Sequence, residues 1–221
     1  EVIGYSRVYW FKLDDGTYTY GHFANLLPAW RKLGIRRAML RHNERRLREI
    51  AMGHANGNGH DCAGRHFECW ASKTETDWRA LLTEEGYTPV RYGYLMVRPD
   101  LENIPDLPLP AGLEVRPVRP EDYLTIWYAS KEAFRDHWGY TEDEWDETNL
   151  RNWQESHTFT PALWQVAWDG NEVVGKVQNF IDTLENQEYK RQRGYTEGIS
   201  VRRPWRGRGI AKALIVRSMH M

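Results

Sequence analysis

The residues best suited to chemistry lie in one short turn near the end of the sequence. Residues 200–214 read SVRRPWRGRGIAKAL, so a strand-like run is followed by a glycine turn and then a helix-like run. Gly207 and Gly209 let the backbone turn tightly and bring successive N–H groups close to a ligand. The helix start adds unpaired N–H donors and the positive end of its dipole, and Arg206 and Arg208 add charge. These groups together suit a pyrophosphate.

The turn differs from the two common phosphate loops. The sequence has no GxxxxGK[ST], and the third glycine of GxGxxG is missing because residue 212 is a lysine. Val201 and the run 206–211 instead match V-x-x-x-x-R-G-x-G-x-A position for position. This pattern resembles the acetyl-CoA pyrophosphate loop of the GNAT acetyltransferase superfamily.

The resemblance extends over most of the chain. It includes FRDHWG (134–139) and the hairpin WQVAWDGNEVVG (164–175), and it is close over 113–221 and loose over 1–98. Together with a repeat described below, these segments are similar to tandem-domain GNAT proteins of the mycothiol synthase kind.

The resemblance implies a set of cofactor-binding residues. Backbone N–H groups of the turn would hold the pyrophosphate of acetyl-CoA, and the backbone around Val201 and Arg202 would pair with the pantetheine arm like an added strand. The implied set is Val201, Arg202, Arg206, Gly207, Arg208, Gly209, Ile210 and Ala211. The alternative interpretation is a glycine turn that joins a strand to a helix and carries solvated arginines.

The acceptor amine must lose a proton before it attacks, so transfer needs a catalytic base, and we expect it on the strand before the turn. GNAT enzymes often place a glutamate there, and Glu197 is the candidate. Strand periodicity predicts that Glu197 shares one face with Val201. A solvated or arginine-paired glutamate is the alternative.

The general acid of many GNATs is a tyrosine that lies past the next strand, which the second copy does not reach. Asp136 and His137 occupy the region of acceptor-facing loops, although capping or packing is favoured for them.

Sliding the sequence by 175 positions reveals an internal repeat between residues 20–39 and 195–214. Six pairs are identical: Tyr20/Tyr195, Trp30/Trp205, Arg31/Arg206, Gly34/Gly209, Ile35/Ile210 and Ala38/Ala213. The first copy has Lys32, Leu33 and Arg36 where the second has Gly207, Arg208 and Ala211, and His22 where the second has Glu197. We therefore expect residues 30–37 to form a degenerate site that binds CoA weakly or not at all.

The repeat suggests a domain organisation. Residues 1–98 are interpreted as the C-terminal half of a degenerate first GNAT-like repeat, 99–112 as a Pro-rich linker, and 113–221 as the N-terminal half of a second repeat that carries the acyl-CoA loop. On this interpretation the chain is a fragment or a permuted fold, and its first residue, Glu1, is consistent with a missing N-terminal portion.

Local patterns predict the elements that position the turn. Strands are expected at 1–13, 17–26, 67–71, 88–97, 113–118, 163–168, 172–181 and 195–201; helices at 34–51, 76–85, 120–134, 141–155 and from 210; and loops at 53–66 and 182–193. The fold class is α/β, α+β layered, with a GNAT-like mixed sheet flanked by helices and two partial repeats.

An edge would remain unpaired on strand 195–201 unless another strand covers it. We expect strand 67–71, helix 76–85 and strand 88–97 to dock beside 113–221 and complete a circularly permuted domain. The alternative is pairing with a second chain, which would give a homodimer.

Composition excludes several classes of protein. A net charge of −1 disfavours a dedicated nucleic-acid binder, and no apolar run is long enough for a membrane helix. Two cysteines, Cys62 and Cys69, fit a reducing compartment, so we expect a cytoplasmic location. His60, Cys62, His66 and Cys69 have the spacing H-x-C-x3-H-x2-C, which fits no regular zinc finger, and no metal site is predicted.

The sequence thus predicts an N-acetyltransferase that moves an acetyl group from acetyl-CoA to a primary amine of a small molecule by direct attack. The main rival is a non-catalytic CoA-binding or scaffold domain. A weaker rival is an RNA-associated protein that uses the arginine face of helix 36–48. A solvated helix face interleaved with Glu44 and Glu49 is favoured over that last interpretation.

Overall fold

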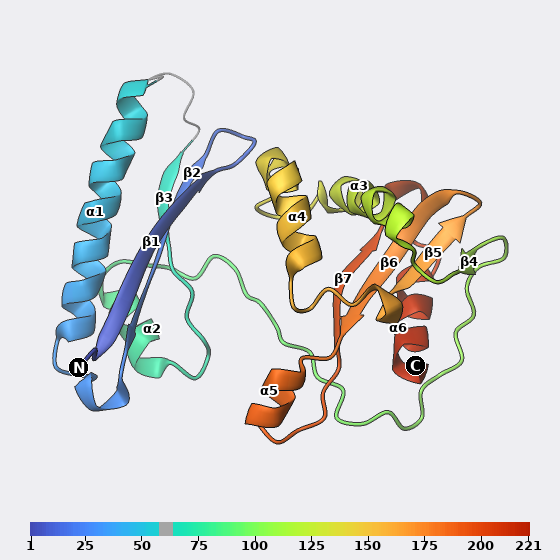
Figure 1. The fold of residues 1–221 in the computed structure, drawn as a ribbon. Helices are drawn as coiled ribbons and strands as arrows, with labels where there is room; N and C mark the ends of the chain where they lie inside the picture. Colours follow the sequence, from blue (N-terminus) through green and yellow to red (C-terminus); the bar gives the residue numbers. More distant parts are fainter. Residues whose placement is uncertain (58–63) are drawn as a thin grey trace. The chain divides into compact units, whose positions relative to one another are not determined.

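The computed structural model describes residues 1–57 and 64–221, which divide into a first unit, Glu1–Leu95, and a second unit, Met96–Met221 (Figure 1). Each unit contains one sheet. The first unit ends at Leu95, three residues before the predicted end of the first half-repeat at Arg98. This division does not test whether the two units are half-repeats, and that interpretation stays a prediction. No helix of the described residues is long and apolar enough to cross a membrane.

The first unit is built on a three-stranded sheet of order β1-β2-β3. Its elements are β1 (Gly4–Lys12), β2 (Tyr18–Leu26), the 3₁₀ helix η1 (Pro28–Trp30), α1 (Ile35–Gly57), β3 (Arg65–Glu68) and α2 (Thr76–Glu84). β1 and β2 form an antiparallel hairpin, and α1 is the crossover that makes β3 parallel to β2. Ala24 and Leu40 pack with Trp78 and Leu82 of α2 to form its core.

The second unit has a four-stranded antiparallel sheet of order β4-β5-β6-β7. Its strands are β4 (Glu114–Val115), β5 (Gln165–Asp169), β6 (Glu172–Phe180) and β7 (Tyr195–Val201). Its helices are α3 (Tyr123–Phe134), α4 (Glu147–Glu155), α5 (Thr183–Glu188) and α6 (Ile210–His220), and its 3₁₀ helices are η2 (Pro120–Asp122), η3 (Glu142–Trp145), η4 (Pro161–Leu163) and η5 (Arg203–Trp205).

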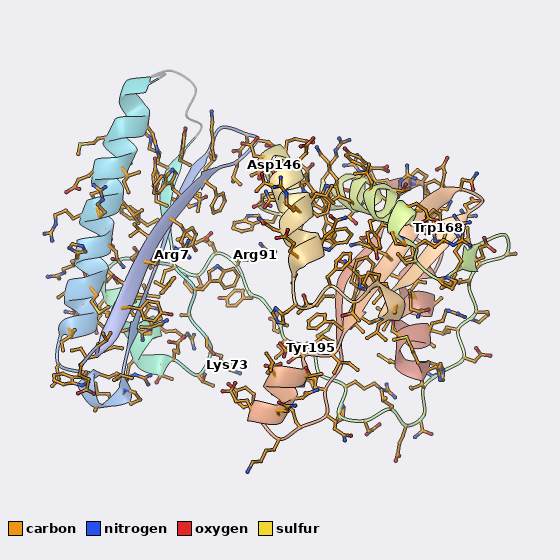
Figure 2. The ribbon with its side chains drawn as sticks, viewed as in Figure 1. Arg7, Lys73, Arg91, Asp146, Trp168 and Tyr195 are labelled. Atoms are coloured by element: carbon orange, nitrogen blue, oxygen red, sulfur yellow. The ribbon has the colours of Figure 1, made fainter. Side chains whose placement is uncertain are left out.

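Helices cover both faces of this second sheet. Adjacent residues of β5 point to opposite faces, so Trp168 (labelled in Figure 2) packs with Ile126 of α3, whereas Ala167 packs with Ile210 and Leu214 of α6. Trp153 of α4 packs against the cluster that contains Trp168. The sheet therefore has an α3/α4 face and an α6 face, each with its own apolar core.

Several predicted elements differ from the observed ones at their ends. Strand 113–118 shrinks to two residues because Pro117 has no N–H to donate to a ladder. The predicted loop 182–193 contains α5, whose N-cap Asp182 accepts a hydrogen bond from the backbone N–H of Glu185 at 2.9 Å. Helix α4 starts at Glu147 rather than at 141, after η3. Helix α1 continues through Gly57 into the predicted loop 53–66, of which 58–63 lie outside the described residues.

The predicted strand 88–97 is wrong. This segment has no regular secondary structure, and Val90, Tyr94 and Met96 are each more than four-fifths exposed. Alternation of side chains becomes a strand only where another strand completes the ladder, and the described residues supply none here.

The expected docking of the first unit's strand beside β7 is also wrong. The predicted strand 67–71 forms as β3 and pairs with β2, from Tyr18↔Arg65 to Gly21↔Glu68. β7 has one neighbour, β6, and its outer edge has no partner strand among the described residues.

Candidate functional site: the turn before α6

The turn between β7 and α6 has the backbone shape that its glycines predict. Gly207 and Gly209 have φ values of 75° and 82°, in the left-handed region that other residues avoid. A Cβ added at either position would meet no described atom within 4 Å. The backbone of both glycines is therefore open on the side where a side chain would stand.

The same turn presents a row of backbone N–H donors. The first α6 bond across the turn runs from the N–H of Ala213 to the carbonyl of Gly209, at 3.0 Å, and no side chain caps the helix start. In the described part of the chain, the N–H groups from Gly207 to Lys212 meet no protein acceptor. Such a row at the positive end of a helix dipole fits an anionic group.

Arg206 holds the turn in place through contacts within the protein. Its Nε donates to the carbonyl of Val201 at 2.9 Å, Nη1 to Asp136 at 2.6 Å, and Nη2 to the carbonyl of Ala133 at 2.8 Å. Its backbone N–H donates to the carbonyl of Arg203 at 3.2 Å. The expectation that Arg206 adds charge at the ligand is corrected: it ties the turn to the end of α3.

Asp136 is the acidic partner of this clamp. Arg203 donates to both of its carboxylate oxygens, and Arg206 donates to Oδ2. Hydrogen bonds from Arg203, which have the larger effect, and from Arg206 hold the pKa of Asp136 far below its ordinary value. Asp136 therefore positions the turn, in line with the packing role favoured from the sequence.

Replacing Asp136 with asparagine should lower stability at pH 7, since the two arginines lose their charged partner. A carboxyl whose folded pKa is depressed stabilises the fold above its unfolded pKa, and that contribution is lost as the pH falls toward the folded value. The wild-type advantage over Asp136→Asn should therefore shrink between pH 5 and pH 3. Urea unfolding measures it, with Asp106→Asn in the Pro-rich segment as the control. An advantage that is constant with pH would contradict the assignment.

At Val201 and Arg202 the backbone is only partly available. The N–H of Arg202 donates to the carbonyl of Val174 on β6 at 2.9 Å, and the Val201 carbonyl accepts from Arg206. The guanidinium of Arg202 pairs with Glu132 at 2.6 Å and Glu172 at 3.1 Å. The N–H of Arg202 is thus used by β6, and pairing of the remaining backbone around Val201 and Arg202 with the pantetheine arm stays a prediction.

A β-bulge in β7 changes the face on which Glu197 lies. Lys176 of β6 is opposite Ser200, but Gln178 is opposite Glu197, so β7 has one extra residue in this interval. Gly198 in this interval has a φ of 54°. The bulge breaks the period of two, so Glu197 is on the α3/α4 face with Lys176, whereas Val201 packs in the α6 cluster. The prediction that Glu197 and Val201 share a face is wrong.

Sequence reasoning missed Lys176. Its side chain is only 4% exposed, and its Nζ donates to Oε1 of Gln178 at 2.6 Å. The Trp153 ring lies 5.8 Å from Nζ. Burial lowers the pKa of Lys176 to about 7. The available signal was a lysine within the otherwise apolar run VVGKV.

A small hollow lies beside Lys176, between α3 and strands β6 and β7. It is lined by Ala129, Ser130, Val173, Gly175, Lys176, Ser200 and Arg202. It is on the α3/α4 face, the same face as Glu197.

The corresponding turn of the first unit has the same backbone shape. Lys32 and Gly34 have φ values of 64° and 77°, close to those of Gly207 and Gly209. Nε of Arg31 donates to the carbonyl of Leu26 at 3.2 Å, as Arg206 does to Val201 175 positions later. Lys32, however, holds a left-handed conformation that is unfavourable for a residue with a Cβ. Weak or absent CoA binding there stays a prediction.

Two side chains of the first unit are committed to packing. Arg36 donates to the carbonyl of Ala24 at 2.8 Å and stacks over the Trp78 ring at 4.0 Å. Nε2 of His22, which takes the place of Glu197, lies 2.8 Å from the hydroxyl of Tyr87, and that hydroxyl donates to Glu44. His22 is buried, so it is not placed like the exposed Glu197. His60 and Cys62 of the weighed zinc pattern lie outside the described residues.

Comparisons with known proteins agree with this geometry. Residues 127–219 match the acetyltransferase (GNAT) family model. A crystal structure of a GCN5-related N-acetyltransferase from Sphaerobacter thermophilus matches 99% of the chain with a TM-score of 0.65, at 21% identity. The chain has the GNAT fold. It spans 64% of the length of that Sphaerobacter protein.

A putative acetyltransferase from Pyrococcus horikoshii matches 54% of the chain and is covered over 37% of its own length, at 14% identity and a TM-score of 0.39. No curated protein matches the chain. The residues of the family match, 127–219, include β7, the turn and all but the last residue of α6.

Proposed function

We propose that this protein is an acyl-CoA-dependent N-acyltransferase that moves an acetyl group from acetyl-CoA to a primary amine of a small molecule by direct attack. The observation that carries the proposal is the row of N–H donors from Gly207 to Lys212, which no described protein acceptor meets, on a GNAT fold. The family match over 127–219 supports acetyl transfer in general, and members of that family generally use acetyl-CoA.

In this proposal the turn binds the pyrophosphate. The N–H groups of Gly207, Arg208 and Gly209 and of the first α6 turn donate to its oxygens, and the exposed side chain of Arg208 adds charge. The clamp of Arg206 and Asp136 keeps the turn in this shape before the ligand arrives. Bound acetyl-CoA supplies a thioester whose carbonyl carbon an amine can attack.

The bulge of β7 is the proposed place of acyl transfer. Gly198 and Ile199 have no cross-strand partner in the register, so a backbone N–H there can donate to the thioester oxygen. Glu197 is next to the bulge and is exposed, so it stays the proposed base that takes a proton from the acceptor amine. The protonated amine gives one proton to the Glu197 carboxylate and attacks the thioester carbonyl carbon in its neutral form. As the new C–N bond forms, the C–S bond breaks, and the CoA thiolate leaves with the proton that the attacking nitrogen loses.

The rival proposal is a CoA-binding domain without transfer. Thiol release from acetyl-CoA separates the two. The purified chain is incubated with acetyl-CoA and a panel of small primary amines, and free CoA is followed over time. Steady release that requires the amine, with the N-acetyl product found by mass spectrometry, is the expected result. Binding of acetyl-CoA without amine-dependent release would favour the rival.

A further inference from the structure

Burial of the Lys176 side chain costs desolvation free energy and so lowers the stability of the fold. It lies in the middle of β6 with 4% of its surface exposed, and none of the ion pairs recorded among the described residues includes it. Desolvation of an ammonium group without an acidic partner penalises the charged form, which is why its pKa falls to about 7. An apolar side chain of similar length would fill the same space without this cost.

The side-chain hydrogen bond of Lys176 leads, through Gln178 of β6, to the bulge of β7. Nζ donates to Oε1 of Gln178 at 2.6 Å. A Cβ placed on Gly198 would come within 2.2 Å of that same oxygen and 3.0 Å of the amide carbon. The Gln178 amide group therefore lies directly over Gly198, and Glu197 is its cross-strand neighbour.

None of the charged groups near Lys176 forms an ion pair with it among the described residues. On β7, Arg202 is bound to Glu132 of α3 and to Glu172 of β6. Glu197 is exposed. Helix α4 contributes the Trp153 ring, and α3 contributes Ser130, whose hydroxyl donates to the carbonyl of Ile126 at 2.7 Å.

We propose that Lys176 is a positioning residue for the acyl-transfer site: it holds the Gln178 side chain over Gly198 and so fixes the bulge of β7. The contribution of Lys176 to acyl transfer rests on the proposed function. The contribution of Lys176 to the shape of the bulge is independent of that function and can be measured without any ligand.

The backbone amide of Gly198 reports on this coupling. In the wild-type chain, its ¹⁵N and ¹H shifts should follow an inflection near pH 7, because loss of the Lys176 proton weakens a charge-assisted bond to the group that lies on Gly198. Lys176→Met and Gln178→Met should each remove the inflection. The Gly170 amide, in the β5–β6 turn, is the internal control. An inflection that persists in Lys176→Met, or is missing from the wild type, would overturn the proposal.

Stability and activity should move in opposite directions in Lys176→Met. The unfolded chain binds more protons than the folded one between pH 7 and the ordinary lysine pKa, so wild-type stability rises with pH across that window. Lys176→Met should therefore be more resistant to urea than wild type at pH 7, and this difference should narrow toward pH 10. Its kcat should fall about tenfold, with the KM for acetyl-CoA within twofold.

The double variant tests whether Lys176 acts through Gln178. If it does, Lys176→Met with Gln178→Met should lose no more activity than either single variant. A double variant whose loss of kcat equals the product of the two single-variant losses would refute the positioning role. An unchanged kcat in a Lys176→Met protein that is more stable than wild type would refute it too. If wild type transfers no acyl group, the proposed function fails, and the Gly198 amide titration still decides whether Lys176 fixes the bulge.

Discussion

Replacing Gly209 with tryptophan should weaken acetyl-CoA binding at least about 100-fold. The Cβ of the new side chain enters space that is empty within 4 Å, and its indole covers the N–H groups at the start of α6. A hydrogen bond to a charged group contributes about 1.5–3 kcal/mol, so losing two of them is sufficient for this effect. Isothermal titration with acetyl-CoA measures the change.

Gly34→Trp is the matched control for this variant. Gly34 occupies the equivalent turn of the first unit, with a φ of 77° against 82° at Gly209, and a Cβ there also meets nothing within 4 Å. Both variants therefore carry the same backbone strain from a side chain in the left-handed region. Gly34→Trp should bind acetyl-CoA like wild type. Equal losses in the two variants would show that general destabilisation, and not a covered anion site, explains the result.

Gly175→Val should destabilise the second unit by about 3 kcal/mol, because overpacking a tight contact forces the backbone to shift. A Cβ on Gly175 would lie 2.9 Å from the carbonyl oxygen of Ser200 and 3.4 Å from Cγ2 of Ile210. Those contacts are with β7 and with the first residue of α6, so acetyl-CoA affinity should fall together with stability. Urea unfolding and titration calorimetry measure the two effects.

Gly194→Val is the control, because a Cβ there lies 4.0 Å from its nearest neighbour, the Phe180 carbonyl oxygen. It should change stability by less than about 0.5 kcal/mol. If Gly175→Val left affinity unchanged while it lowered stability, the start of α6 would not be part of the binding site.

The turn could be predicted from sequence because its determinants are local. Glycines at 207 and 209, followed at once by a helix-forming run, specify both the left-handed backbone and the unpaired N–H groups. The alternation around the turn Asp169-Gly170-Asn171 likewise predicted the β5–β6 hairpin, since a short turn sets its own register.

Features that depend on distant partners were not predictable in the same way. The strand expected at 88–97 failed because no described strand pairs with it. The bulge at Gly198 is a property of two paired strands, so strand periodicity alone assigned Glu197 to the wrong face. Arg206 looked like a ligand-binding charge because Asp136, its partner, is 70 positions away.

The most direct test of the central claim is the change in backbone amide shifts when acetyl-CoA is added to the ¹⁵N-labelled chain. The account predicts that the largest changes fall on the amides from Gly207 to Lys212, since these are the donors that meet no described protein acceptor. The equivalent amides from Lys32 to Arg37 should stay in place. Saturating acetyl-CoA that leaves the amides of Gly207–Lys212 unmoved would contradict the account.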